Sequence, residues 1–175
     1  MPTNSYTNHT FDEIEVGASE TVTRTVTVNE VEALSLAAGD VESFHTRGAD
    51  RAVGKGPSTQ GAAAAAILAG MLNRRLPGPG GAIVGSQLQY GGAIHVGDTL
   101  TASVTARAKH ADGHRIEFEC RCTNQHGDVL AAGMVTVSAP TRRIAYSNLA
   151  TPQIVLRHND GFVPFHGGHQ DAIPT

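Results

Sequence analysis

The stretch Gly61-Ala62-Ala63-Ala64-Ala65-Ala66-Ile67-Leu68-Ala69-Gly70-Met71-Leu72 decides the fold of this chain. A helix formed by these residues is apolar on every face, which is typical of a helix buried in a protein core. Its alanines keep the helix thin, so that a sheet can wrap closely around it. Pro77-Gly78-Pro79-Gly80-Gly81 then stops the helix, because a run of proline and glycine disfavours helical structure. We therefore expect one central helix enclosed by a sheet.

Strand-like segments precede and follow this helix. One covers residues 20–28, and the others cover residues 82–90, 99–109, 114–123 and 128–139. Threonine and valine are frequent in the first segment, and β-branched side chains suit the pleated surface of a strand. A strand before the helix and a run of strands after it predict an α+β domain.

Apolar and charged residues alternate most clearly in the segment 114–123. Its apolar positions carry Ile116, Phe118, Cys120 and Cys122, with charged residues between them, as in a sheet that has one face in solvent. Side chains at alternate positions of a strand point the same way, which is a poor geometry for a disulfide. We therefore interpret the two cysteines as buried small apolar residues, in preference to a redox or metal pair.

A shorter helix is predicted before the central one. Thr27-Val28-Asn29-Glu30 fits a capping box, in which the threonine oxygen accepts a bond from a helix N–H and the glutamate reaches back. The helix should run to about Ala38. Residues 46–60 are glycine-rich and polar, and we expect a loop there. Ser58 or Thr59 can cap the central helix.

Three groups near these helix ends outline a reaction site. Asp40 and His45 follow the short helix, and Gly61 stands at the head of the central helix. A carboxylate, an imidazole and an N–H at a helix start can together hold a water molecule and polarise a carbonyl. From the spacing alone, however, a turn residue is the favoured interpretation of Asp40 and an exposed loop histidine that of His45.

Composition excludes several classes of protein. A chain of 175 residues most often makes one domain. Its formal net charge of −3, without a basic stripe, argues against a nucleic-acid partner. The longest apolar run, 61–72, is too short to span a bilayer, and residues 1–4 lack the features of a signal peptide, so we expect a cytoplasmic protein without a membrane partner.

We expect no metal site, because His158, His166 and His169 lack the spacing of a metal motif.

A resemblance to a known family makes the prediction of the fold more specific. Ala38-Gly39-Asp40-Val41-Glu42-Ser43-Phe44-His45 resembles the Gly-Asp-x-Asn-Pro-x-His signature of MaoC-like (R)-specific enoyl-CoA hydratases. Other stretches agree with it, namely Phe11-Asp12-Glu13-Ile14 with Val16-Gly17, Leu76-Pro77-Gly78-Pro79-Gly80, and Val96-Gly97-Asp98-Thr99-Leu100. The resemblance covers residues 11–140. It implies a hotdog fold, in which an antiparallel sheet wraps around a long central helix.

A narrower resemblance concerns the end of this domain. Residues 119–127 and Ala139-Pro140-Thr141 look like the hydratase domain that precedes a phosphate acetyl- or butyryltransferase in bifunctional proteins. Residues 1–10 are polar and are expected to be a flexible N-terminus, the family resemblance places the hydratase domain at 11–140, and residues 141–175 are then a C-terminal tail or linker. A phosphate acyltransferase is then a candidate partner.

The resemblance also assigns roles in a reaction. It implies that Asp40 is the catalytic acid, that His45 is the catalytic histidine and that the backbone N–H of Gly61 forms the oxyanion hole. These groups would hydrate trans-2-enoyl-CoA to (R)-3-hydroxyacyl-CoA, and dehydrate it in reverse, with no cofactor besides the coenzyme A of the substrate. Family members generally pair through sheet edges, so a homodimer or a hexamer of dimers is expected.

Basic residues in the loop near the predicted site are candidates for the phosphates of coenzyme A. They are Arg47, Arg51 and Lys55. For each of them singly, a solvated basic side chain is the favoured interpretation.

Two departures from the family pattern leave alternatives open. Glu42-Ser43 replaces the Asn-Pro of the signature, and Gln60 replaces the histidine that usually precedes the oxyanion glycine. A carboxylate at Glu42 would disfavour ionisation of Asp40. One alternative is another thioester enzyme on the same fold, such as a thioesterase or a dehydratase for a branched or dicarboxylic acyl-CoA. The other is a non-catalytic acyl-CoA-binding or assembly module with a decayed site.

Overall fold

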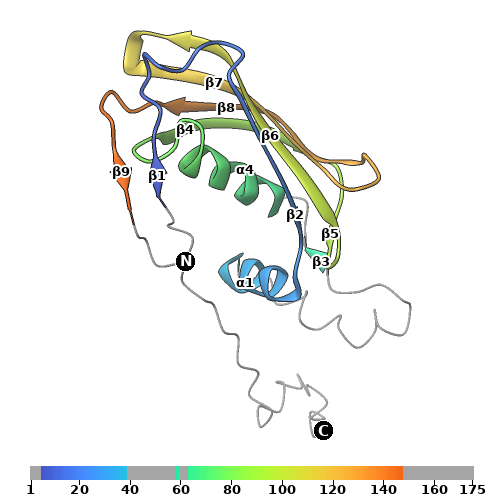
Figure 1. Cartoon of the computed structure of the whole chain (residues 1–175). Helices are drawn as coiled ribbons and strands as arrows, with labels where there is room; N and C mark the ends of the chain where they lie inside the picture. Colours follow the sequence, from blue (N-terminus) through green and yellow to red (C-terminus); the bar gives the residue numbers. More distant parts are fainter. Residues whose placement is uncertain (1–4, 39–57, 60–62, 148–175) are drawn as a thin grey trace, which may run out of the picture.

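A curved antiparallel sheet wraps around one helix in the computed structural model, which describes residues 5–38, 58–59 and 63–147 (Figure 1). The sheet has five strands in the order β2-β6-β7-β8-β4. Their bounds are β2 Ser19–Thr25, β4 Ala82–Tyr90, β6 Thr99–His110, β7 Arg115–Thr123 and β8 Val129–Ser138. The central helix, α4, spans Ala63–Arg74. This architecture confirms the hotdog fold that the resemblance implied.

The core lies between α4 and the inner face of the sheet. Leu68 and Leu72 of α4 are each 1% exposed, and Phe118 of β7 is fully buried. Burying one such side chain stabilises a fold by about 1.5–3 kcal/mol. Ala64 is also fully buried, because a methyl group lets the helix come close to the strands. The apolar helix and the alternating strand therefore form the two halves of one core.

The alternation predicted for β7 is confirmed. Cys120 and Cys122 are fully buried and free, on the same face as Phe118. Burial, with a smaller contribution from the charge of Glu119, raises the pKa of the Cys120 thiol to about 12. Burial also raises the pKa of Cys122. Both residues are thus small apolar parts of the core.

The shorter predicted helix is present as α1, at Val28–Ala38. The N–H of Thr27 donates to Oε2 of Glu30 at 2.8 Å, which is half of the predicted capping box. The N–H of Glu30 in turn donates to the Thr27 carbonyl at 3.2 Å. Val31 is 1% exposed and packs into the core, so α1 is held to the rest of the domain by its inner face.

Two small sheets lie outside the main one. β3 (Ser58–Thr59) pairs with β5 (Ile94–His95), and β1 (Tyr6–Thr7) pairs with β9 (Ala145–Tyr146). The prediction that Ser58 or Thr59 caps the central helix is wrong, because both residues belong to β3 and α4 begins only at Ala63. The second pair joins the segments that the sequence assigned to the flexible N-terminus and to the tail.

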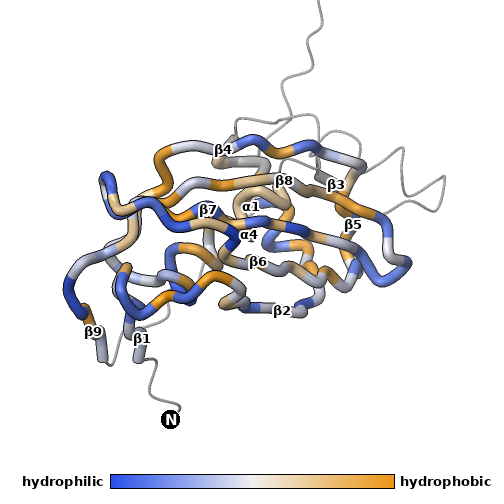
Figure 2. Tube along the Cα trace, turned by 90° about the horizontal axis from the view of Figure 1, so that it is seen from above, coloured by the Kyte–Doolittle hydropathy of each residue, from blue (hydrophilic) through white to orange (hydrophobic). Residues whose placement is uncertain are grey.

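The sheet ends in two open edges, β2 on one side and β4 on the other (Figure 2). β4 carries no charged residue, and its exposed side chains include Ile83, Val84 and Tyr90. Across from it, β8 contains Gly133 with a φ of +152°. A Cβ at this position would collide with the carbonyl oxygen of Gln87. β4 therefore lies close against β8, and no strand of the described residues pairs with its other edge.

Helices of the described ranges are all too short or too polar to cross a membrane.

Candidate functional site

The residues predicted to do chemistry all lie outside the described residues. They are Asp40, His45 and Gly61, together with the basic residues Arg47, Arg51 and Lys55. The same holds for Glu42, Ser43 and Gln60, where the chain departs from the family signature. The structure describes the elements on either side of them, and these elements define the surroundings of the predicted site.

Both flanks of the predicted site meet in one region. α1 ends at Ala38, two residues before Asp40. β3 ends at Thr59, two residues before Gly61, and α4 begins two residues after it. α1 contacts β3, the short strand in which the chain returns to the described residues. The helix before the predicted site and the strand before Gly61 are therefore in contact with each other.

A pocket of about 420 Å³ opens between α1, α4, β2 and β5. Its wall is mostly apolar and includes Val22, Leu34, Ile67, Gly70 and Ile94. Gly70 leaves room, because a Cβ added there would meet nothing within 4 Å. An apolar pocket between the helix that precedes the predicted site and the helix that follows it is suited to an acyl chain.

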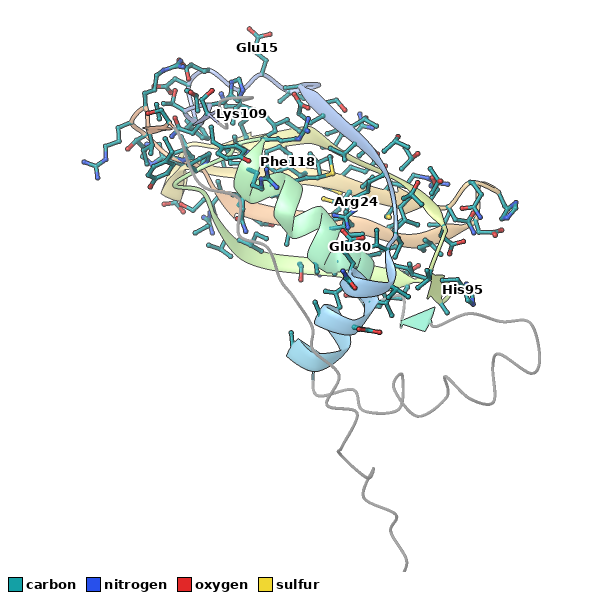
Figure 3. The ribbon with its side chains drawn as sticks, turned by 60° about the horizontal axis from the view of Figure 1, so that its bottom comes forward. Glu15, Arg24, Glu30, His95, Lys109 and Phe118 are labelled. Carbon is teal, nitrogen blue, oxygen red and sulfur yellow. The ribbon has the colours of Figure 1, made fainter. Side chains whose placement is uncertain are left out.

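Charged side chains line the rim of this pocket. Arg24 of β2 forms an ion pair with Glu30 of α1, as Figure 3 shows. Partial burial would raise the pKa of Glu30, but hydrogen bonds from Thr27 and the charge of Arg24 outweigh it, so the pKa lies below its ordinary value. The ion pair joins β2 to the start of α1 and closes one side of the pocket.

Two more arginines lie at the far end of α4. Arg74 donates to the hydroxyl of Tyr6, and its guanidinium lies 4.7 Å from the centre of the Tyr6 ring. Arg75 lies 3.6 Å from a carboxylate oxygen of Glu20. The pocket therefore has an apolar interior and a rim that carries more cationic than anionic side chains, an arrangement that favours an anionic amphiphile.

Sequence reasoning missed this pocket, although one signal was available. Ala66, Gly70 and Arg74 are spaced by four residues, and residues at this spacing share one face of a helix. Two small residues in such a row leave a hollow beside the helix. What the sequence did not reveal is that α1 and β2 would cover this hollow instead of filling it.

The described residues hold no group of three or more histidine, cysteine, aspartate or glutamate side chains placed to bind a metal ion. The histidines that were considered as ligands, His158, His166 and His169, lie outside these residues.

Comparison with known proteins connects this fold to one group of enzymes. The chain is 29% identical over 136 residues to the (R)-specific enoyl-CoA hydratase of Rhodospirillum rubrum, across 77% of this chain and 94% of that protein. It is 27% identical over 129 residues to the (R)-specific enoyl-CoA hydratase of Aeromonas caviae, across 73% of this chain and 96% of that protein. No family model matches the chain.

A solved structure agrees with these similarities. The R-hydratase PhaJ1 of Pseudomonas aeruginosa, in its unliganded form, superposes with a TM-score of 0.79 over 88% of this chain and 100% of that chain. Sequence identity in this pair is 22%, so the match supports the fold alone. The chain is thus a distant homologue of enzymes with hydratase names, on a shared hotdog fold.

Proposed function

We propose that this distant homologue of (R)-specific enoyl-CoA hydratases adds water to trans-2-enoyl-CoA thioesters and gives (R)-3-hydroxyacyl-CoA. The observation that carries the proposal is the similarity to the Rhodospirillum rubrum hydratase, which extends over 94% of that protein. Hydroxide adds at C3 of the substrate and a proton adds at C2. Dehydration follows the same steps in reverse, so that metabolite levels set the direction.

In this proposal, three groups of the protein each carry out one part of the hydration reaction. Asp40 and His45 hold the water molecule between them, and one of them accepts a proton from it while the other assists. Positioned acid–base groups typically contribute about 10²–10⁴-fold in rate. The N–H of Gly61 donates to the thioester oxygen, on which negative charge develops. One such donor is often worth roughly 3 kcal/mol. The contact of α1 with β3 is consistent with this division, since α1 precedes Asp40 and β3 precedes Gly61 in the chain.

The acyl chain occupies the pocket beside Gly70 in this proposal. Its apolar wall suits hydrocarbon, and it lies between the helix that leads to Asp40 and the helix that follows Gly61. The phosphates of coenzyme A lie outside the pocket, where Arg47, Arg51 and Lys55 are the predicted partners. The reaction uses no cofactor besides the coenzyme A that the substrate carries.

The free edge of β4 supports a homodimer. An uncharged edge strand with exposed apolar side chains is a template for pairing with another chain. Ile83 is 39% exposed, Val84 57% and Tyr90 52%. Pairing β4 with its own copy would cover these side chains and continue the sheet from one subunit to the next. A hexamer of such dimers remains a prediction of the sequence.

A partnership with a phosphate acyltransferase also remains a prediction. The two relatives described above are named as (R)-specific enoyl-CoA hydratases, and they do not bear on the narrower resemblance to bifunctional proteins.

A second candidate is a non-catalytic acyl-CoA-binding module, which the departures Glu42-Ser43 and Gln60 favour. Incubation with crotonyl-CoA separates the possibilities. Loss of the conjugated enoyl absorbance without release of free thiol supports hydration, and thiol release indicates a thioesterase. Retained binding of crotonyl-CoA with neither signal would replace the hydratase proposal by the module.

A further inference from the structure

One tight turn holds the two arms of the chain that lead into the predicted site. The turn is His95-Val96-Gly97-Asp98, between β5 and β6. It is closed by the N–H of Asp98, which donates to the carbonyl of His95 at 3.1 Å. Gly97 has a φ of +91°, a conformation that glycine adopts without strain. The turn is therefore a defined local structure with backbone groups left to bind its neighbours.

The first arm is the entry into α1. The N–H of Gly97 donates to the carbonyl of Val26 at 2.9 Å, and the N–H of Val26 donates to the carbonyl of Asp98 at 2.8 Å. Val26 is 5% exposed and is followed directly by the capping box of α1. The turn thus fixes the residue from which α1 begins, and α1 ends two residues before Asp40.

The second arm is the entry into α4. Ser58 of β3 lies opposite His95, and Thr59 lies opposite Ile94. Ile94 is 1% exposed, so β5 is anchored in the core on one side. β3 pairs with this anchored strand and ends two residues before Gly61. The same turn therefore contacts the segment before α1 directly and the strand before Gly61 through β5.

The side chain of Asp98 organises the turn. Its Oδ2 accepts a hydrogen bond from the N–H of His95 at 2.8 Å. Its Oδ1 accepts one from Nε2 of Gln125 at 3.0 Å, while Oε1 of Gln125 accepts one from the N–H of Thr99 at 2.9 Å. Only 13% of the Asp98 side chain is exposed. A single carboxylate therefore ties the turn to β5 and, through Gln125, to the β7–β8 connection.

We propose that Asp98 is a positioning residue for the reaction: by holding the 95–98 turn, it keeps the arm that leads to Asp40 and His45 in register with the arm that leads to Gly61. This inference rests on the hydratase proposal for its effect on catalysis. Its structural part, the coupling of Val26 and β3 through one turn, does not depend on the activity.

The test compares Asp98→Ala and Asp98→Asn with the unmodified chain. Alanine removes both accepted hydrogen bonds. Asparagine keeps the size of the side chain, but its NH2 group faces one of the two donors. Asp112→Asn is the matched control, because Asp112 pairs with Arg115 in the turn at the opposite end of β6. Figure 3 shows His95 at one end of the molecule and Lys109, near this control, at the other.

Hydrogen–deuterium exchange followed by mass spectrometry is the first measurement. In both Asp98 variants we expect faster exchange in peptides that contain residues 26–31 and 58–63, with no change in the core of β7. Asp112→Asn should leave all of these peptides unchanged. Unchanged exchange at 26–31 and 58–63, or equal acceleration throughout the sheet, would overturn the positioning role.

Hydration of crotonyl-CoA is the second measurement. A small misplacement of reacting groups costs up to about a hundredfold, so kcat should fall about tenfold to a hundredfold in the Asp98 variants with KM within about twofold. Asp112→Asn should keep the kcat of the unmodified chain. A fall in kcat without local exchange changes would contradict the proposed route. If the unmodified chain does not hydrate crotonyl-CoA, the hydratase proposal fails, and the exchange data still decide whether the turn couples the two arms.

Discussion

The side chain of Asn8 is bonded to the backbone of Ile144, 136 residues further along the chain: its Oδ1 accepts a hydrogen bond from the Ile144 N–H at 2.8 Å. Its Nδ2 donates to the carbonyl of Arg142 at 2.9 Å, and Asn8 is fully buried. Arg143 forms an ion pair with Glu13 next to this contact. The segment after β8 is therefore held against the N-terminal segment by a buried amide.

Asn8→Ala should lower the stability of the domain. It leaves the Ile144 N–H and the Arg142 carbonyl without their partner, and an unsatisfied buried group costs about 1–3 kcal/mol. Urea denaturation measures the free energy of unfolding. Asn73→Ala, at an exposed position near the end of α4, is the control and should stay within about 0.5 kcal/mol of the unmodified chain. Equal effects of the two substitutions would contradict the role of Asn8.

Asp40→Asn and His45→Ala should each lower kcat for hydration of crotonyl-CoA by about 10²–10⁴-fold, because each removes a positioned acid–base group. Asp112→Asn and His110→Ala are the matched controls. Both alter exposed residues near the other end of the sheet, and both should keep the original rate. An unchanged rate in Asp40→Asn or in His45→Ala would remove that residue from the mechanism.

Gly70→Leu should shorten the range of accepted acyl chains. A Cβ at position 70 meets no neighbour within 4 Å and Gly70 lines the pocket, so we expect the new side chain to occupy part of the pocket. Excluding two or three methylene groups, at about 0.8 kcal/mol each, predicts a loss of roughly tenfold to fiftyfold in kcat/KM for dec-2-enoyl-CoA. Crotonyl-CoA should be hydrated as before.

Gly70→Ala provides the control for this pocket. Its methyl group leaves most of the space open, and replacing glycine inside a helix stabilises it by about 1 kcal/mol. We expect a raised Tm with little change in chain-length preference. A Gly70→Leu variant that hydrates the long substrate as well as the unmodified chain does would place the acyl chain elsewhere.

Val84→Glu should convert a dimer into a monomer. Val84 lies on the free edge strand β4 and is 57% exposed, and a charge at its position opposes pairing with a second copy. Light scattering coupled to size-exclusion chromatography measures the mass. Val16→Glu is a matched control, because Val16 is 59% exposed but lies outside β4. If both variants keep the mass of the unmodified chain, β4 is not the interface.

The two thiols should be unreactive in the folded chain. Because the pKa of Cys120 is raised to about 12 and that of Cys122 is also raised, almost no thiolate is present at pH 8. A thiol reagent should detect none in native protein and two after unfolding in guanidinium. Rapid labelling of the native protein would show that β7 opens to solvent.

Periodic patterns predicted the large elements of the fold. The apolar run around Leu68 gave the central helix, and the alternation through Phe118 gave β7. The capping box at Thr27 gave the start of α1. In each case the signal extends over a full turn of helix or several residues of strand, so that local sequence determines the structure.

Contacts between distant residues account for what the sequence did not predict. β3 and β5 have two residues each, too few to show a period, and Ser58 pairs with His95, which is distant from it in the sequence. The pocket lies between α1, α4, β2 and β5, which come together only in the tertiary structure. The predicted roles of Asp40 and His45 came from a motif, and they remain predictions.

A substitution at Gly133 would be detected as a loss of soluble protein. Any side chain there would push β4 away from β8, because it collides with the Gln87 carbonyl. The edge of β8 that β4 normally covers would then present unpaired backbone N–H and C=O groups to other molecules, and unpaired strand edges promote aggregation. A substitution at Gly133 would therefore appear as insoluble protein during expression rather than as an inactive enzyme, and a screen for lost activity in soluble extracts would overlook it.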